Sequence, residues 1–152
     1  RAALGIGYMP EDRGLVPQLT VEENILLPLW VQPALPRDKR LALAYELLPE
    51  VKAMHDRKAL LLSGGQQKLV ALARALVVGT KLLLLDEPFE GVAPALAQRL
   101  ADVIHALQGT TLAVLISQSD VHHGAGLFVR EYTIERGANA VGSAPLSTSA
   151  IR

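Results

Sequence analysis

Apolar residues along the chain follow two different periods, and together these periods predict alternating strands and helices. Three short, largely apolar runs fit strands: Leu4–Met9, Leu82–Leu85 and Thr111–Ser117. The last two contain no polar alternation, which is typical of parallel strands buried on both faces. Apolar residues at helical spacing predict further helices that begin near Thr20, Arg37, Ser63 and Ala95. Strand, helix and strand in this order imply a parallel, right-handed crossover and therefore an α/β fold.

Local signals define the helices in the first third of the chain. Thr20 is followed three residues later by Glu23, a spacing typical of a capping box at a helix start. Pro28 lies inside the same apolar pattern and should shorten or kink that helix. A second helix is expected from Arg37 to Val51. The single tryptophan, Trp30, is interpreted as a core or partner-facing anchor.

Two more signals mark the ends of elements in the rest of the chain. Gly79 follows the last apolar residue of the third helix and should end it. Residues Phe128–Glu135 alternate like a strand, and residues 136–139 (RGAN) resemble a hairpin turn. The sequence therefore predicts a small antiparallel unit near its C-terminal end.

Composition narrows the class of protein. The 152 residues are half apolar, which is enough for one domain with a substantial core. Fifteen basic and fifteen acidic residues cancel, so we expect no nucleic-acid partner. The absence of cysteine fits a reducing compartment, for which the cytoplasm is the default. No apolar run is long enough to span a membrane, so we expect any membrane association to come through a partner.

Small residues stand at the start of the third helix. Ser63, Gly64, Gly65 and Gln66 leave backbone N–H groups uncovered where the helix dipole is positive. Such a helix start favours an anion, phosphate above all. We therefore predict a phosphate-binding role for these four residues.

Two consecutive acids follow the most apolar strand. In open α/β sheets ligands bind beyond the carboxyl ends of the strands, where Asp86 and Glu87 are expected. A hard cation such as Mg²⁺ suits one carboxylate together with phosphate and water oxygens, and a neighbouring carboxylate can activate water. We assign Asp86 to the metal and Glu87 to the attacking water.

These motifs carry a family resemblance. LSGGQQ at Leu62–Gln67, followed by LLLLDEP at Leu82–Pro88, resembles the signature and Walker B motifs of ATP-binding cassette (ABC) transporter ATPases. EPFEGVAP at Glu87–Pro94 is most similar to the ATPases of branched-chain amino-acid importers. The resemblance implies a P-loop NTPase-like, mostly parallel sheet core that is incomplete here, with an inserted α-helical subdomain and a C-terminal β-hairpin. Its expected segments are core strand and Q-loop (1–11), helical subdomain and signature helix (12–78), and remaining core (79–152).

The resemblance also implies ligands and partners. ATP and Mg²⁺ are the expected cofactors, and the signature residues would face an ATP held by a second ATPase subunit. Transmembrane permease subunits would hold the protein at the cytoplasmic face of the inner membrane. The uptake of branched-chain amino acids or a related small solute is the leading interpretation. A non-catalytic interaction module, or an ABC ATPase acting in DNA repair or translation, are the alternatives.

The chain also departs from the family pattern. Glu11 stands where the Q-loop usually has glutamine, and Ala93 replaces the usual D-loop aspartate. Ser119 stands at the position of the switch histidine, with Gln118 as the alternative one residue earlier. No GxxxxGK[ST] phosphate loop is present, so the chain resembles only the latter part of such a subunit and is expected to bind ATP weakly or not at all alone.

Overall fold

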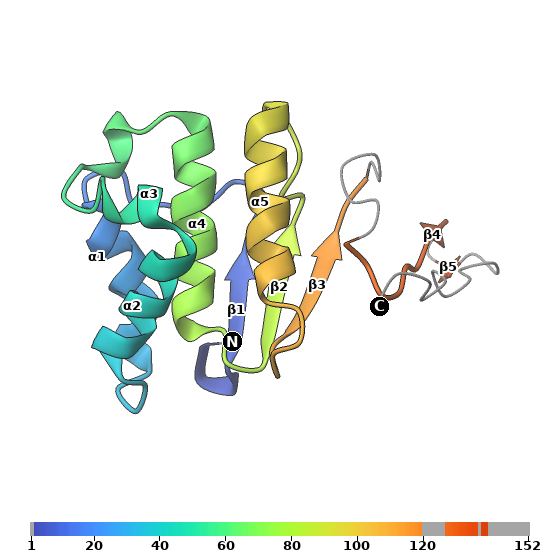
Figure 1. The fold of residues 1–152 in the computed structure, drawn as a ribbon, viewed down its shortest axis with the longest axis horizontal. Helices are drawn as coiled ribbons and strands as arrows, with labels where there is room; N and C mark the ends of the chain where they lie inside the picture. Colours follow the sequence, from blue (N-terminus) through green and yellow to red (C-terminus); the bar gives the residue numbers. More distant parts are fainter. Residues whose placement is uncertain (1, 120–126, 137, 140–152) are drawn as a thin grey trace. The chain divides into compact units, whose positions relative to one another are not determined.

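The computed structural model describes residues 2–119, 127–136 and 138–139, which fall into two units, 1–119 and 120–152. In the first unit, three parallel strands form a sheet in the order β1 (Ile6–Met9), β2 (Leu82–Asp86), β3 (Ala113–Ser117). Helix α5 (Pro94–Ala106) lies in front of the strands, and α4 (Gly64–Val78) lies beside it and packs on β1 (Figure 1). The α/β class and the parallel order predicted from the sequence are confirmed.

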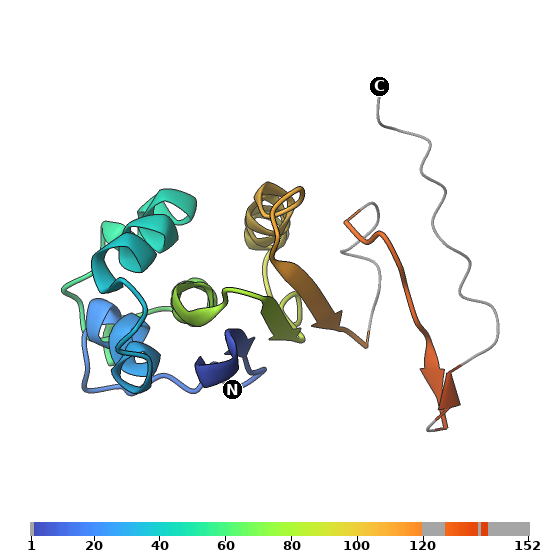
Figure 2. The same ribbon diagram turned by 90° about the horizontal axis from the view of Figure 1, so that it is seen from below.

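Three further helices form a layer on the far side of α4. They are α1 (Val21–Leu26), α2 (Arg37–Leu47) and α3 (Pro49–Lys52), and both α1 and α2 pack on α4 (Figures 1 and 2). Short 3₁₀ turns join these elements: η1 (Ala2–Leu4), η2 (Leu27–Val31) and η3 (Ala59–Leu61). No helix in the described part of the chain is long and apolar enough to cross a membrane.

The strands are covered on one face only, and the prediction of burial on both faces is wrong. In β2, Leu83 and Leu85 are buried while the alternate residues are half-exposed. In β3 the side chain of Leu115 is 59% exposed. The reason is that the segments of this unit cover only one face of β1 and β2, as the alternation of buried and half-exposed residues shows, and β3 has a neighbouring strand on one side only. An apolar run in the sequence does not show whether one face or both faces of the strand are covered by other segments.

Leu83 packs in a notch formed by two glycines distant in sequence. A Cβ on Gly7 would lie 2.1 Å from the carbonyl oxygen of Ala75 and 2.7 Å from Leu83 Cδ2. A Cβ on Gly79 would lie 2.4 Å from the same Leu83 atom. Gly79 does end α4 as predicted, but with φ of −70°, so the close approach rather than a left-handed backbone requires glycine there.

The predicted capping box at the start of α1 is confirmed. The backbone N–H of Glu23 donates to Thr20 Oγ1, and the N–H of Thr20 donates to Glu23 Oε2 over 2.7 Å. Pro28 shortens the helix as expected, since α1 ends at Leu26 and a 3₁₀ turn follows. The single helix predicted from Arg37 to Val51 is wrong: Pro49 keeps Leu48 out of the helical region, at φ −132° and ψ 67°, and splits it into α2 and α3.

Other boundaries also differ from those predicted. The first strand begins at Ile6 instead of Leu4, because Gly5 turns the chain with φ of 77°. Trp30 is 70% exposed, so it is not a core residue. In the second unit, β4 (Ile134–Glu135) pairs antiparallel with β5 (Ala138–Asn139). The hairpin is therefore confirmed, but its strand is shorter than the predicted Phe128–Glu135, and residues 138–139 belong to the returning strand instead of the turn.

Two arginines connect the helical layer to the core. Arg40 of α2 donates to the carbonyl oxygens of Leu76, Val77 and Gly79 at the end of α4, the last two over 2.8 and 2.7 Å. Arg99 of α5 pairs with Glu50 of α3 through two hydrogen bonds of 2.7 and 3.1 Å. Both contacts join residues far apart in sequence, so they fix the layer against the core.

Candidate functional site

Asp86 lies at the carboxyl end of β2, where its carboxylate is held from both neighbouring strands. The hydroxyl of Tyr8 on β1 donates to Oδ2 over 3.2 Å, and the hydroxyl of Ser117 on β3 donates to Oδ1. The register explains the second contact, because Asp86 pairs with Ser117 across the sheet. No cluster of three or more metal-ligating side chains occurs in the described residues. A single oriented carboxylate fits a cation that takes its other ligands from phosphate and water, as Mg²⁺ does.

Glu87 adopts an unusual backbone conformation next to Asp86. Its φ is 46°, in the left-handed region, which costs a non-glycine residue about 1 kcal/mol or more. Its Oε1 accepts a hydrogen bond of 2.8 Å from the backbone N–H of Ser119. Its Oε2 is buried and has no hydrogen-bond partner. A buried acceptor without a donor is rare in proteins, and a carboxylate oxygen left in this state can take a proton from a water molecule that enters the site.

The loop after Glu87 is anchored by two side chains from other elements. The ammonium group of Lys68 on α4 donates to the carbonyl oxygens of Glu87, Pro88 and Glu90 over 3.0, 3.2 and 2.5 Å. The side-chain oxygen of Gln118 accepts a 3.4 Å hydrogen bond from the N–H of Phe89. The loop therefore holds its shape through contacts to both α4 and the end of β3.

Charged groups from two loops, the one after β1 and the one after β2, act on Lys68. Burial lowers the pKa of its ammonium group, and the guanidinium of Arg13 lowers it further. The carboxylates of Glu90, Glu11 and Glu87 act in the opposite direction on the same pKa. Glu11 itself is exposed, and the one interaction seen for its carboxylate among the described residues is this effect on the pKa of Lys68.

The start of α4 forms a separate, exposed surface. Ser63 Oγ accepts from the N–H of Gln66 over 3.3 Å, and the Gln66 side-chain oxygen accepts from the N–H of Ser63 over 3.0 Å. Ser63 and Gly64 are exposed, and Gly65 and Gln66 are half-exposed. A helix of this length, begun by exposed small residues, leaves its positive end accessible to an anion.

Loop residues 13 and 14 are fixed to the same helix. The Arg74 guanidinium donates to the carbonyl oxygens of Arg13 and Gly14, the latter over 2.6 Å. Arg13 donates to the side-chain oxygen of Gln67 over 3.4 Å and has φ of 66°. Burial lowers the pKa of Arg74. Helix α4 thus contacts the loops after β1 and β2, and its own start carries the exposed signature surface of Ser63, Gly64, Gly65 and Gln66.

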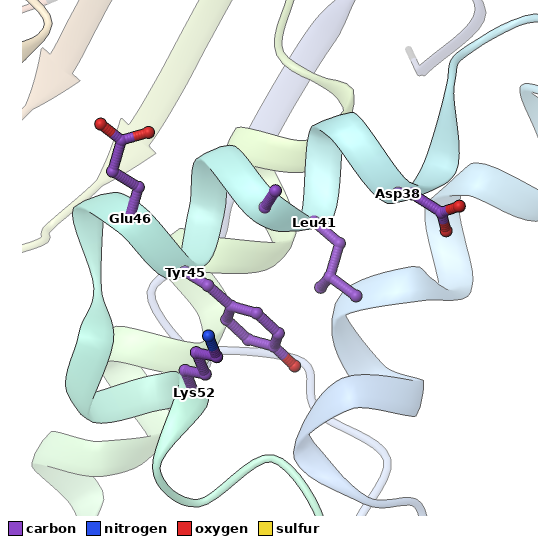
Figure 3. Close-up of a pocket in the computed structure, with 6 residues that line it drawn as sticks. Asp38, Leu41, Tyr45, Glu46 and Lys52 are labelled. Carbon is purple, nitrogen blue, oxygen red and sulfur yellow. The ribbon is translucent and has the colours of Figure 1, made fainter.

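A shallow cavity of about 380 Å³ lies on the helical layer. Figure 3 shows that its lining comes from α2 and α3, with the Tyr45 ring at its centre. The Tyr45 hydroxyl donates to Glu22 on α1 over 2.9 Å, and burial together with this carboxylate raises its pKa. None of the predicted site residues lines this cavity.

The structure thus brings some of the predicted residues together and leaves others apart. Asp86, Glu87 and Ser119 lie at one edge of the sheet, although Ser119 contributes its backbone N–H to the contact with Glu87. Ser63 and its three successors form their own surface. Tyr8 and Lys68 were missed by sequence reasoning. The signal for Lys68 was available, because a lysine within an apolar helix face implies a buried partner.

Comparison with known proteins connects these motifs to a family. The family model described as "ABC transporter" matches residues 2–90. The lipopolysaccharide export ATP-binding protein LptB of Haemophilus influenzae is 37% identical over 139 residues, covering 90% of this chain and 58% of LptB. The branched-chain amino-acid transport ATP-binding protein BraG of Pseudomonas aeruginosa is 33% identical over 132 residues, covering 87% and 57%.

Solved structures give the same relation. The ADP conformation of MJ1267, an ATP-binding cassette of an ABC transporter, has a TM-score of 0.72 and 27% identity, covering 91% of this chain and 60% of that one. Dimeric MJ0796, a bacterial ABC transporter cassette, has a TM-score of 0.66 and 26% identity, covering 82% and 56%. This likeness confirms the predicted fold class. The chain spans somewhat less than two thirds of the length of these relatives.

Proposed function

Because the chain belongs to the ABC transporter family, we propose that it is the signature and Walker B part of an ATPase subunit that hydrolyses ATP to drive transport. The observation that carries this proposal is the Glu87 carboxylate. One of its oxygens is held by the Ser119 N–H, while the other is buried without a donor at the edge of the sheet where ligands of α/β proteins bind. A water molecule that enters the site would find this oxygen without a competing donor and could give up its proton to it.

Each acid has a separate role in this proposal. Asp86, oriented by Tyr8 and Ser117, would hold Mg²⁺, which supplies positive charge to the phosphate oxygens when bound. Glu87 would accept a proton from the attacking water at Oε2. Ser119 and Gln118 hold the carboxylate and the adjoining loop in place. Glu11, exposed on the neighbouring loop, would contribute to the same nucleotide site.

The signature surface serves a second subunit in this proposal. Ser63, Gly64, Gly65 and Gln66 would contact the phosphates of an ATP bound by that subunit, as their exposure at a helix start permits. The dimeric cassette among the similar structures supports an arrangement of two subunits. Since this sequence contains no GxxxxGK[ST] motif, we expect no tight ATP binding by these 152 residues alone.

For the transported solute, the EPFEGVAP segment and the similarity to BraG support uptake of branched-chain amino acids or a related small solute. Similarity to LptB supports a second candidate, an ATPase for lipopolysaccharide export. In both cases permease subunits would hold the protein at the cytoplasmic face of the inner membrane. Measuring uptake of labelled branched-chain amino acids in a strain that lacks the gene would distinguish the two, because only the first candidate expects a loss of uptake.

The catalytic assignment is tested by Glu87→Gln in the natural full-length protein with its permease. Loss of a carboxylate that activates water is expected to lower the ATP hydrolysis rate about a hundredfold or more while ATP binding remains. Glu46→Gln is the matched control, because Glu46 is an exposed glutamate on α2, in the helical layer. Hydrolysis at the wild-type rate in Glu87→Gln would remove the basis of the proposal.

A further inference from the structure

Lys68 uses its whole hydrogen-bonding capacity on one loop. Lys68 is only 3% exposed. Its ammonium group carries three N–H donors and contacts three backbone carbonyl oxygens. These belong to Glu87, Pro88 and Glu90, at 3.0, 3.2 and 2.5 Å. Burying a lysine costs free energy unless its charge is well solvated by such acceptors. The buried ammonium group, which costs free energy to bury, therefore fixes the backbone of the four-residue segment 87–90.

The segment that Lys68 holds contains the strained residue. Glu87 has φ of 46°, a conformation that persists only where surrounding contacts enforce it. The Lys68 ammonium binds the carbonyl of Glu87 itself, whereas the backbone N–H of Ser119 binds its side chain. Glu87 is thus held at its backbone carbonyl by Lys68 and at its side-chain carboxylate by Ser119. If the carbonyl is released, the backbone of Glu87 can relax and its Oε2 can leave the buried position.

Lys68 also connects this loop to the exposed start of α4. It lies three residues after Gly65, about one helical turn from the signature surface. The helix segment between them is the same rigid element that packs on β1.

We propose that Lys68 is a positioning residue, which holds the Glu87 carboxylate in the orientation for activating water through the carbonyl oxygens of residues 87, 88 and 90. The inference rests on the proposed ATPase function and deepens it, because it assigns a role to a residue on the signature helix in the chemistry of its own subunit. Lys68 does not contact the reacting atoms, and its effect passes entirely through the loop.

The test compares variants of the natural full-length protein with its permease. Lys68→Met removes all donors and keeps an unbranched side chain, and Lys68→Arg keeps donors in a planar group that cannot match three converging carbonyls. Lys39→Met is the matched control, since Lys39 is an exposed lysine on α2. A misplaced catalytic group costs up to about a hundredfold in rate, so Lys68→Met should lower kcat about tenfold to a hundredfold with KM within about twofold, and Lys68→Arg should lie between.

A double variant separates positioning from a general loss of structure. If Lys68 acts through Glu87, then Lys68→Met combined with Glu87→Gln should hydrolyse ATP no more slowly than Glu87→Gln alone. Multiplied effects in the double variant, or a kcat of Lys68→Met within twofold of Lys39→Met, would overturn the proposal. If Lys68→Met does not fold, the same comparison is made with Lys68→Arg.

A second measurement keeps the inference distinct from the proposed function. Hydrogen exchange at the amides of Phe89 and Glu90 should be faster in Lys68→Met than in Lys39→Met, whether or not the protein hydrolyses ATP. Unchanged exchange at these amides would refute the inference that Lys68 fixes the loop of residues 87–90. A wild-type protein without hydrolysis would refute the proposed function and with it the positioning role, while faster exchange would still show that Lys68 fixes the loop.

Discussion

Replacing Arg40 by methionine should destabilise the protein by releasing the C-terminal end of α4. The Arg40 guanidinium donates to the carbonyl oxygens of Leu76, Val77 and Gly79, which have no next helical turn to bind them. The positive charge of Arg40 also interacts favourably with the negative, C-terminal end of the helix dipole. Methionine keeps most of the apolar side chain but none of these interactions.

The magnitude follows from the burial of the acceptors. Leu76 and Val77 are 2% and 0% exposed, so water cannot fully replace the lost donors. A hydrogen bond to a charged group contributes roughly 1.5–3 kcal/mol, and three bonds from one group do not add fully. Burial lowers the pKa of Arg40, which means that the charged form also carries a desolvation cost that the variant recovers. We expect a net loss of about 2–4 kcal/mol in the free energy of unfolding.

Urea unfolding of the natural full-length protein, followed by circular dichroism, measures this loss. Arg37→Met is the matched control, because Arg37 is exposed at the start of α2, the helix that also carries Arg40. It should change the free energy of unfolding by less than about 0.5 kcal/mol. A loss below about 1 kcal/mol in Arg40→Met, relative to Arg37→Met, would show that the carbonyl groups find other donors and that the cap is not needed.

Two further predictions concern the Ser119 hydroxyl, which should have little effect on the ATP hydrolysis rate, and the Glu23 carboxylate, which should contribute to stability only above acidic pH. Ser119→Ala should change the ATP hydrolysis rate by less than about threefold, because the backbone N–H and not the hydroxyl binds Glu87; a loss as large as that of Glu87→Gln in the same assay would contradict this. Hydrogen bonds from Thr20 lower the pKa of Glu23, so Glu23 contributes stability above its ordinary pKa of about 4.3 and loses it as the pH falls through the lowered value. Unfolding curves of the wild type and Glu23→Gln should therefore differ at pH 7 and converge at low pH, and a constant difference would refute the assignment.

Features that depend on neighbouring residues could be predicted from the sequence. The capping box of Thr20 with Glu23 was predicted because its residues are three apart, so a local pattern contains all the information. The box of Ser63 with Gln66 has the same spacing but was not predicted. The position of Asp86 and Glu87 at the sheet edge also followed, because a parallel strand must end at that edge. Pro49 gave a usable signal as well, but the apolar period across it favoured one continuous helix over two.

Features that depend on residues far apart could not be predicted. The hydroxyl of Tyr8 reaches Asp86 only because the strands pair with Met9 opposite Leu85, a register that no local pattern defines. The ammonium group of Lys68 finds its three acceptors about twenty residues further along the chain. The exposure of Leu115 depends on what covers the sheet, which apolar content does not record.

The notch around Leu83 makes different demands on its two glycines. At Gly79 the tightest obstacle is the Leu83 side chain, and the carbonyl oxygen of Ala75 follows at 3.1 Å. Alanine at 79 should therefore cost less when residue 83 is smaller, and the two positions should vary together among homologous proteins. At Gly7 the nearest obstacle is a backbone oxygen, that of Ala75, which no change of side chain removes. Position 7 should therefore stay glycine in every homologue whose helix lies this close to the first strand.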